Sequence, residues 1–392
     1  MKLKFNLFVL LTFFYLNVAA QETNAPKFGK GIFNIVAKDS TWSMKIGARM
    51  QFLADFRDSN ESNFLVRRAR LKFDGFAYSP KLKYKIELGL SNRDIGGSSI
   101  YTGNAPRIIL DAVMKYNFAK NLEFWFGQTK LPGNRERVIS SANMQMVDRS
   151  ILNARFNIDR DMGIQLRHHF TISDHFVVRE ILSISKGEGR NVVWRNLGGW
   201  QYTGRVELLP MGNFTGKGDY FGSDLKREPK PKLSIAAGYN LNHNAVRTRG
   251  NQGSFMTTDN GFYETNISNV FVDAILKYKG FSFMTEYANR NSDNPFATNG
   301  DGTETGDKVQ VGQGYNFQSG YLFKNNWEIS GRYSHVKLDK KITGKEPEIQ
   351  YTLGLSKFLV GHSLKVQSDV SLIDTNLTNK VLMWRVQFDI HF

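Results

Sequence analysis

The sequence has no cysteine among its 392 residues, and it has only 9 prolines. Disulfides therefore cannot stabilise the fold, and a lipid-attachment cysteine is excluded. After Leu16 there is no apolar run near the roughly 18 residues that a membrane-spanning helix requires, which excludes helical insertion. Glycine (35 residues) and aromatic residues (13%) are abundant instead. This composition is typical of a β-protein with many hairpins, and a closed barrel in lipid would supply stability without disulfides.

The first twenty residues have the organisation of a secretory signal. Lys2 and Lys4 precede an apolar run, and the small residues Val18-Ala19-Ala20 precede Gln21. Such a segment is too short and wrongly flanked to be a membrane anchor, so residues 1–20 are predicted to be a signal peptide. The exported chain then has 50 basic and 36 acidic residues, a formal charge of about +14. Export also excludes nucleic acid as the partner of this basic chain.

Basic and apolar residues alternate in the stretch FLVRRARLKFDG (64–75). Odd positions from Leu65 to Ala77 are mostly apolar, whereas the even positions include Arg68, Arg70, Lys72 and Asp74. A β-strand sends alternate side chains to opposite faces. The stretch therefore predicts a strand with one apolar face and one basic face.

The same alternation recurs in about 16 segments, most of them as long as the roughly 9 to 11 residues of a tilted transmembrane strand. Connections alternate between short ones, such as Ser79-Pro80 and Lys279-Gly280, and long polar ones, such as 131–160 and 242–268. Outer-membrane barrels place short turns in the periplasm and long loops outside. Residues 21–392 are thus predicted to form an all-β, transmembrane, antiparallel up-and-down β-barrel of about 16 strands in the outer membrane of a Gram-negative bacterium. A soluble sandwich is the alternative, but it does not explain the alternating connections.

Four stretches carry a resemblance to a known family: 66–92, 126–136, 204–212 and the terminal VQFDIHF. With these stretches the chain resembles the phosphate-selective porins O and P, in the form common among Bacteroidetes. The resemblance implies a 16-stranded barrel, usually trimeric, through which anions diffuse passively, with phosphate or polyphosphate as candidate solutes. It also implies that the C-terminal Phe392 belongs to the signal read by the barrel-assembly machinery.

If the apolar faces meet lipid, the opposite faces line a lumen. The predicted lining is rich in cations, which would concentrate anions in a water-filled pore. Its candidate pore-lining, anion-attracting residues are Lys45, Arg49, Arg68, Arg70, Lys72, Lys81, Lys83, Lys85 and Lys115. The alternative is a charge-balanced lumen, in which nearby carboxylates offset these cations: Asp55, Asp74, Glu87 and Asp111.

The longest outer connection, residues 131–160, has no strand pattern, and loops of this length usually have a function. Its position predicts a loop that folds into the lumen as a constriction, as the third loop does in general porins. An exposed cap is the alternative. The constriction candidates are Arg135, Arg137, Arg149 and Arg155.

Other motifs do not indicate an enzyme or a metal site. His168 and His169 are neighbours on a strand and point to opposite faces. The stretch 299–307 resembles a calcium loop, but Glu304 stands where that loop requires glycine. No phosphate-binding loop or nucleophile elbow is present. We therefore expect no catalysis, cofactor or metal, and as partners small anions, membrane lipid and two further copies of the chain. The alternative function is an accessory barrel, with a closed lumen, in a larger outer-membrane complex.

Overall fold

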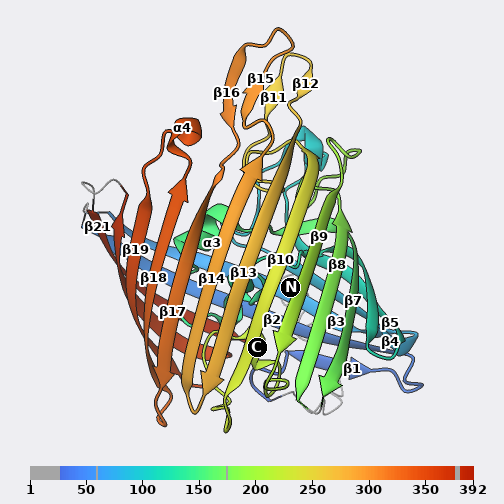
Figure 1. Cartoon of the computed structure of the whole chain (residues 1–392). Coiled ribbons are helices and arrows are strands. Elements are labelled where there is room, and N and C mark those ends of the chain that lie inside the picture. Colours follow the sequence, from blue (N-terminus) through green and yellow to red (C-terminus); the bar gives the residue numbers. More distant parts are fainter. Residues whose placement is uncertain (1–26, 59–60, 174, 376–379) are drawn as a thin grey trace, which may run out of the picture.

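The computed structural model describes residues 27–58, 61–173, 175–375 and 380–392 (Figure 1). The predicted signal peptide, residues 1–20, lies outside the described residues. The main sheet is a closed antiparallel barrel of 16 strands, which confirms the predicted fold. Its strands are Trp42–Arg57 (β2), Ser62–Ala77 (β3), Ser79–Gly89 (β4), Ile109–Ala119 (β5), Leu122–Lys130 (β6), Arg160–Ser173 (β7), Phe176–Ser185 (β8), Gln201–Leu209 (β9), Lys232–Ala245 (β10), Thr265–Tyr278 (β13), Phe281–Ser292 (β14), Gly312–Leu322 (β17), Trp327–Leu338 (β18), Glu348–Phe358 (β19), Leu364–Asp374 (β20) and Lys380–His391 (β21).

The barrel closes where the last strand pairs with the first. In this seam β21 lies antiparallel to β2, with Arg49 opposite His391 and Phe52 opposite Phe388. The short strand Phe33–Val36 (β1) continues along the same edge of β2 beyond the end of β21. Closure leaves no unpaired sheet edge in the membrane, which is what a spanning β-structure requires.

The connections at the two barrel ends differ in length, as the sequence predicts. Within the described part of the chain, one end has short turns, except for residues 210–231, and most connections at the other end are longer. Two hairpins project from the long-loop end (Figure 1). They are formed by Thr257–Thr258 (β11) with Gly261–Phe262 (β12), and by Phe296–Thr298 (β15) with Glu304–Lys308 (β16). The loops also contain short helices: Ile100–Thr102 (η2), Arg135–Val138 (α2), Ser141–Asn143 (η3), Ile151–Phe156 (α3), Gly218–Tyr220 (η4) and Lys340–Thr343 (α4).

A turn of two residues joins β13 to β14. Lys279 and Gly280 both have positive φ angles, 46° and 92°. A two-residue hairpin with both central residues in this region matches the right-handed twist of the flanking strands. The turn is therefore fixed by local backbone geometry and has no room for an insertion.

Topology can be tested with inserted epitope tags. A tag at Asp301-Gly302, in the β15–β16 hairpin, should be labelled by antibody on intact cells. A tag between Lys279 and Gly280 should not be labelled, and it should reduce the yield of folded barrel severalfold because it breaks the two-residue turn. Labelling only the second tag on intact cells would reverse the predicted orientation.

The distribution of side chains is the inverse of that in a soluble protein. Large apolar residues cover the outer wall, and Phe64 and Leu353 are 77% and 72% exposed there. The largest fully buried side chains include Arg135, Arg205 and Lys277, all inside the barrel. Among the residues that the structure describes, no helix is long and apolar enough to cross a membrane.

The strict alternation predicted for 64–75 is wrong at one point. A β-bulge in β3 shifts the register, so that Gln51 pairs with Arg68 while Phe52 pairs with Val66. The extra residue is Arg67, and both Arg67 and Arg68 are buried on the inner side, at 8% and 7% exposure. Bulges re-aim side chains in this way. Consecutive arginines therefore both face the lumen, although Arg67 occupies an odd position.

The C-terminal residue completes the seam. The backbone N–H of Phe392 donates to the carbonyl oxygen of Ala48 at 2.9 Å, and its ring lies 5.7 Å from the ring of Phe28 in an edge-on arrangement. Deleting Phe392 removes both contacts, so we expect severalfold slower formation of the folded barrel. Folding can be followed by the mobility shift of unheated samples in gel electrophoresis. Phe118→Ala, on the outer wall, serves as the control, and normal folding without Phe392 would contradict this role.

Candidate functional site

Residues 131–159 lie inside the barrel. Leu131, Leu152 and Phe156 form an apolar cluster with Phe271 and Val336 of the barrel wall. Helix α3 starts at a favourable cap, because the Ser150 hydroxyl accepts a hydrogen bond from the Asn153 N–H at 3.1 Å. Apolar packing thus holds the loop against the part of the barrel wall that β13, β14 and β18 form.

Polar contacts hold the centre of this loop against the far wall. The ammonium group of Lys365, on β20, donates to the carbonyl oxygens of Ala142 (3.0 Å) and Met144 (3.1 Å). The side-chain amide of Gln145 donates to Ser282 and Glu328, both at 2.8 Å. These contacts come from three different strands, so the loop is fixed across the lumen.

The connection 210–231 enters the barrel from the short-turn end. Lys277 of β13 donates to the carbonyl oxygens of Gly218 (2.8 Å), Phe221 (3.0 Å) and Ser223 (2.7 Å). The Gly222 N–H of this connection donates to the carbonyl oxygen of Asn143, in the 131–159 loop, at 2.8 Å. A Cβ at Gly222 would lie 2.6 Å from the backbone nitrogen of Gln145, so this close approach of the two loops requires glycine. Among the described connections at this end, the long one, 210–231, therefore also occupies part of the lumen.

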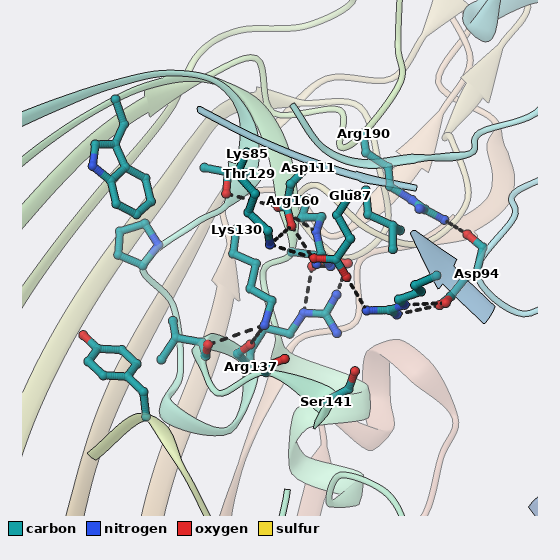
Figure 2. Close-up of a pocket in the computed structure, with 18 of the residues that line it drawn as sticks. Lys85, Glu87, Asp94, Asp111, Thr129, Lys130, Arg137, Ser141, Arg160 and Arg190 are labelled. Atoms are coloured by element: carbon teal, nitrogen blue, oxygen red, sulfur yellow. Dashed lines mark hydrogen bonds and ion pairs between the residues drawn. The ribbon is translucent and has the colours of Figure 1, made fainter. Parts of the chain in front are cut away.

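Two cavities lie along the β3–β9 side of the lumen. The upper cavity, between the 131–159 loop and the wall, measures about 480 Å³ (Figure 2), and the lower cavity, toward the short-turn end, measures about 670 Å³. Among the described residues that line the upper cavity, 13 are Lys or Arg and five are Asp or Glu. The lower cavity is lined by six Lys or Arg and two Glu. Both cavities therefore have a strong excess of positive charge.

Part of this charge is neutralised in an ion-pair network on β3–β7. Arg70 binds Glu87 at 2.9 Å, and Lys85 binds Glu87 and Asp111, both at 2.6 Å. Arg160 also binds Asp111, at 3.0 Å (Figure 2). For these side chains, carboxylates therefore offset the cations, as in the charge-balanced lumen that the sequence left open.

Other cations in the upper cavity bond to neutral groups. Lys130 donates to the carbonyl oxygens of Arg137 (2.9 Å) and Ile139 (3.1 Å), and Arg149 donates to those of Glu136 and Ile139, both at 2.9 Å. Burial, followed by repulsion from Arg137, lowers the pKa of Arg149 to about 9, so this group remains charged at neutral pH. Carbonyl oxygens orient these cations without cancelling their charge.

Two carboxylates of the loop, Asp148 and Asp159, remain ionised. Burial alone would raise the pKa of Asp159, but attraction to Arg137 and Arg160 outweighs it and holds the pKa well below the usual range. For Asp148, burial again opposes the attraction, and Arg67 and Arg68 lower the pKa. Protonation near neutral pH therefore does not alter these pairs.

The predicted pore-lining residues divide among three cavities, except for Arg49 and Lys45. Arg68, Arg70, Lys85 and Lys115 line the upper cavity, and Lys81, Lys83 and again Lys115 line the lower one. Lys72 lines a smaller cavity of about 340 Å³ and is paired with Asp74 at 2.7 Å. Arg49 lies beneath the loop, where it binds Asp389 (2.7 Å) and the Ser141 hydroxyl (2.7 Å). Lys45 is half-buried and lines none of these three cavities.

The four loop arginines also divide. Arg137 and Arg149 line the upper cavity. Arg135 points the other way and binds Asp273 at 2.9 Å, with no exposed surface. Arg155 binds Glu348 at 2.6 Å, outside that cavity. The sequence alone did not single out Arg67, Lys130, Arg167 and Arg190 as lining residues; Arg167 was identifiable from its inward parity on β7.

The family is decided by the sequence comparison. Residues 44–382 match the family description "phosphate-selective porin O and P". The chain belongs to this porin family. Membership, together with the closed barrel, makes it an outer-membrane channel protein.

Solved porins share the fold of this family member at low sequence identity. OmpF of Salmonella typhi, in complex with daunomycin, has a TM-score of 0.58 and 11% identity over 92% of this chain and 100% of its own. An anion-selective porin from Comamonas acidovorans has a TM-score of 0.52 and 11% identity over 90% and 100%. The trimer form of OmpT of Vibrio cholerae has the same values. A search of curated proteins found no match.

Within the described residues, no group of three His, Cys, Asp or Glu side chains is arranged to hold a metal ion. This includes 299–307, where Asp301 instead accepts a hydrogen bond from the Thr303 hydroxyl at 2.6 Å.

Proposed function

We propose that this porin conducts small anions passively across the outer membrane, after export directed by residues 1–20. The proposal rests on the charge around the upper cavity, where 13 of the described lining residues are basic and five are acidic. A confined, water-filled space with such an excess attracts anions and repels cations.

The lining favours transit over tight capture. A phosphate is held most strongly by arginine forks aimed at its oxygens. Here Arg70 and Arg160 are committed to carboxylates, whereas Lys130 and Arg149 bond to carbonyl oxygens. A passing anion therefore meets a basic surface on which many donors are already occupied, and it is concentrated without being trapped.

The loop 131–159 is proposed to be the constriction, with Arg137 and Arg149 facing the solute. Arg135 and Arg155 would instead hold the loop in place. The trimer form of OmpT suggests that three copies of this chain assemble, each with its own lumen. Catalysis has no place in this account, because diffusion requires no reacting group.

The experiment is single-channel recording with the purified protein in a planar bilayer. Discrete conductance steps in chloride, reduced when phosphate is the only anion, are the expected result. A folded barrel with no steps would favour the accessory role with a closed lumen.

A further inference from the structure

The two cavities meet at a short junction. Among the described residues, five line both of them: Lys115, Trp125, Arg167, Ile181 and Tyr220. The first four come from the consecutive strands β5 to β8, and Tyr220 comes from the 210–231 loop. A solute that moves from one cavity to the other must pass these side chains.

Trp125 is the centre of this junction. Lys115 stands directly opposite it on β5, with its ammonium nitrogen 3.8 Å from the ring centroid. The guanidinium carbon of Arg167, on β7, lies 3.9 Å from the same centroid. Because β5 and β7 flank β6 on opposite sides, the two cations approach the indole from opposite sides. The indole N–H donates to Glu123 at 2.9 Å, which fixes the ring between them.

Both cations are available to a solute. Arg167 donates to the Gln165 side-chain oxygen at 2.8 Å, and among the described residues no carboxylate forms an ion pair with Arg167 or Lys115. Both side chains are half-buried, so water and solutes reach them. Arg70 and Lys85 differ from these two cations, because carboxylates neutralise their charges.

The surface near these two charges is aromatic and aliphatic. Trp125 separates the cations, and Tyr220 and Ile181 complete the passage. Inorganic phosphate is compact and gains nothing from apolar contact. It also cannot pair with both cations unless one leaves the indole. A flat solute with an acidic group at each end can reach both cations and lay its apolar body along the edge of the indole and beside Tyr220.

We propose that this junction selects organic dianions with a flat apolar body, of which aromatic dicarboxylates are the simplest class. The proposal rests on the proposed function, because the solute must reach the junction through the lumen. The proposal also makes Trp125 a specificity-determining residue. A pore that only attracts anions through a row of basic side chains would not need it.

The test is block of the chloride current by added anions in planar bilayers. The probes are terephthalate, with two carboxylates on one ring, benzoate, with one, and inorganic phosphate. Terephthalate should reach half-block at a concentration roughly tenfold below that of either other probe, because it alone uses both cations and the ring. Trp125→Ala should remove this preference, and Trp125→Phe should keep part of it. Trp384→Ala, on the outer wall, should be blocked by each probe at the same concentration as the parent.

Folding of each variant is checked by heat-dependent gel mobility. If Trp125→Ala does not fold, Lys115→Gln and Arg167→Gln provide the same test, since each should bring terephthalate to the level of benzoate. Equal block by terephthalate and phosphate in the parent would overturn the proposal, as would an unchanged preference in the folded variants. An anion-selective channel with that result would leave the proposed function standing, whereas a cation-selective channel would refute the proposed function itself.

Discussion

The double variant Lys115→Glu/Arg167→Glu should lose the anion preference of the channel or reverse it. Both side chains line the upper and the lower cavity, and the exchange changes the local charge by four units. The charges lie in a confined lumen, where counter-ions screen them less than on an open surface. The measurement is the reversal potential of parent and variant in a tenfold potassium chloride gradient.

A matched control is Lys340→Glu/Lys341→Glu on α4, in the outer loop between β18 and β19. It makes the same change of four charges, but Lys340 is 67% exposed by its side chain and lies outside both cavities. Its reversal potential should equal that of the parent. If the Lys115/Arg167 variant also matched the parent, selectivity would have to arise elsewhere.

Removal of the inner loop should have the largest effect on conductance. Replacing residues 137–155 by a short Gly-Ser linker removes η3, all of α3 except Phe156, and the contacts that join the loop to Lys365 and, through Gln145, to Glu328. We expect the single-channel conductance to rise severalfold and the anion preference to weaken, because Arg137 and Arg149 leave with the loop.

Shortening the β15–β16 hairpin is the control, since this hairpin belongs to an outer loop but lines neither cavity, and conductance should stay unchanged. A milder variant, Lys365→Ala, removes two hydrogen bonds to the loop and should give noisier open states. Parent-like conductance in the folded loop deletion would show that 131–159 is not the constriction.

The sequence predicted the barrel well because its information is local. Each strand has a period of two, and short connections such as Lys279-Gly280 follow from local turn geometry. Arg67 shows where this reasoning ends. The bulge in β3 places Arg67 as an extra residue between Val66, which pairs with Phe52, and Arg68, which pairs with Gln51. The alternating sequence pattern does not predict it.

Pairing inside the lumen was not predictable in the same way. Arg135 was a reasonable constriction candidate, yet it binds Asp273, which is 138 residues away in the chain. Such contacts depend on how the loop crosses the barrel, and alternation carries no information on that path. The inward fold of 210–231, anchored by Lys277, has the same origin. Its unusual length at the short-turn end was the one available signal.

The central claim, an anion-selective lumen, is tested most directly by the reversal potential of the parent protein. Potassium and chloride have nearly equal mobility in water, so an unselective pore gives a potential near zero in a tenfold gradient. We predict that the dilute side becomes negative, with chloride preferred over potassium by a factor on the order of ten. A potential near zero, or a positive dilute side, would contradict the account.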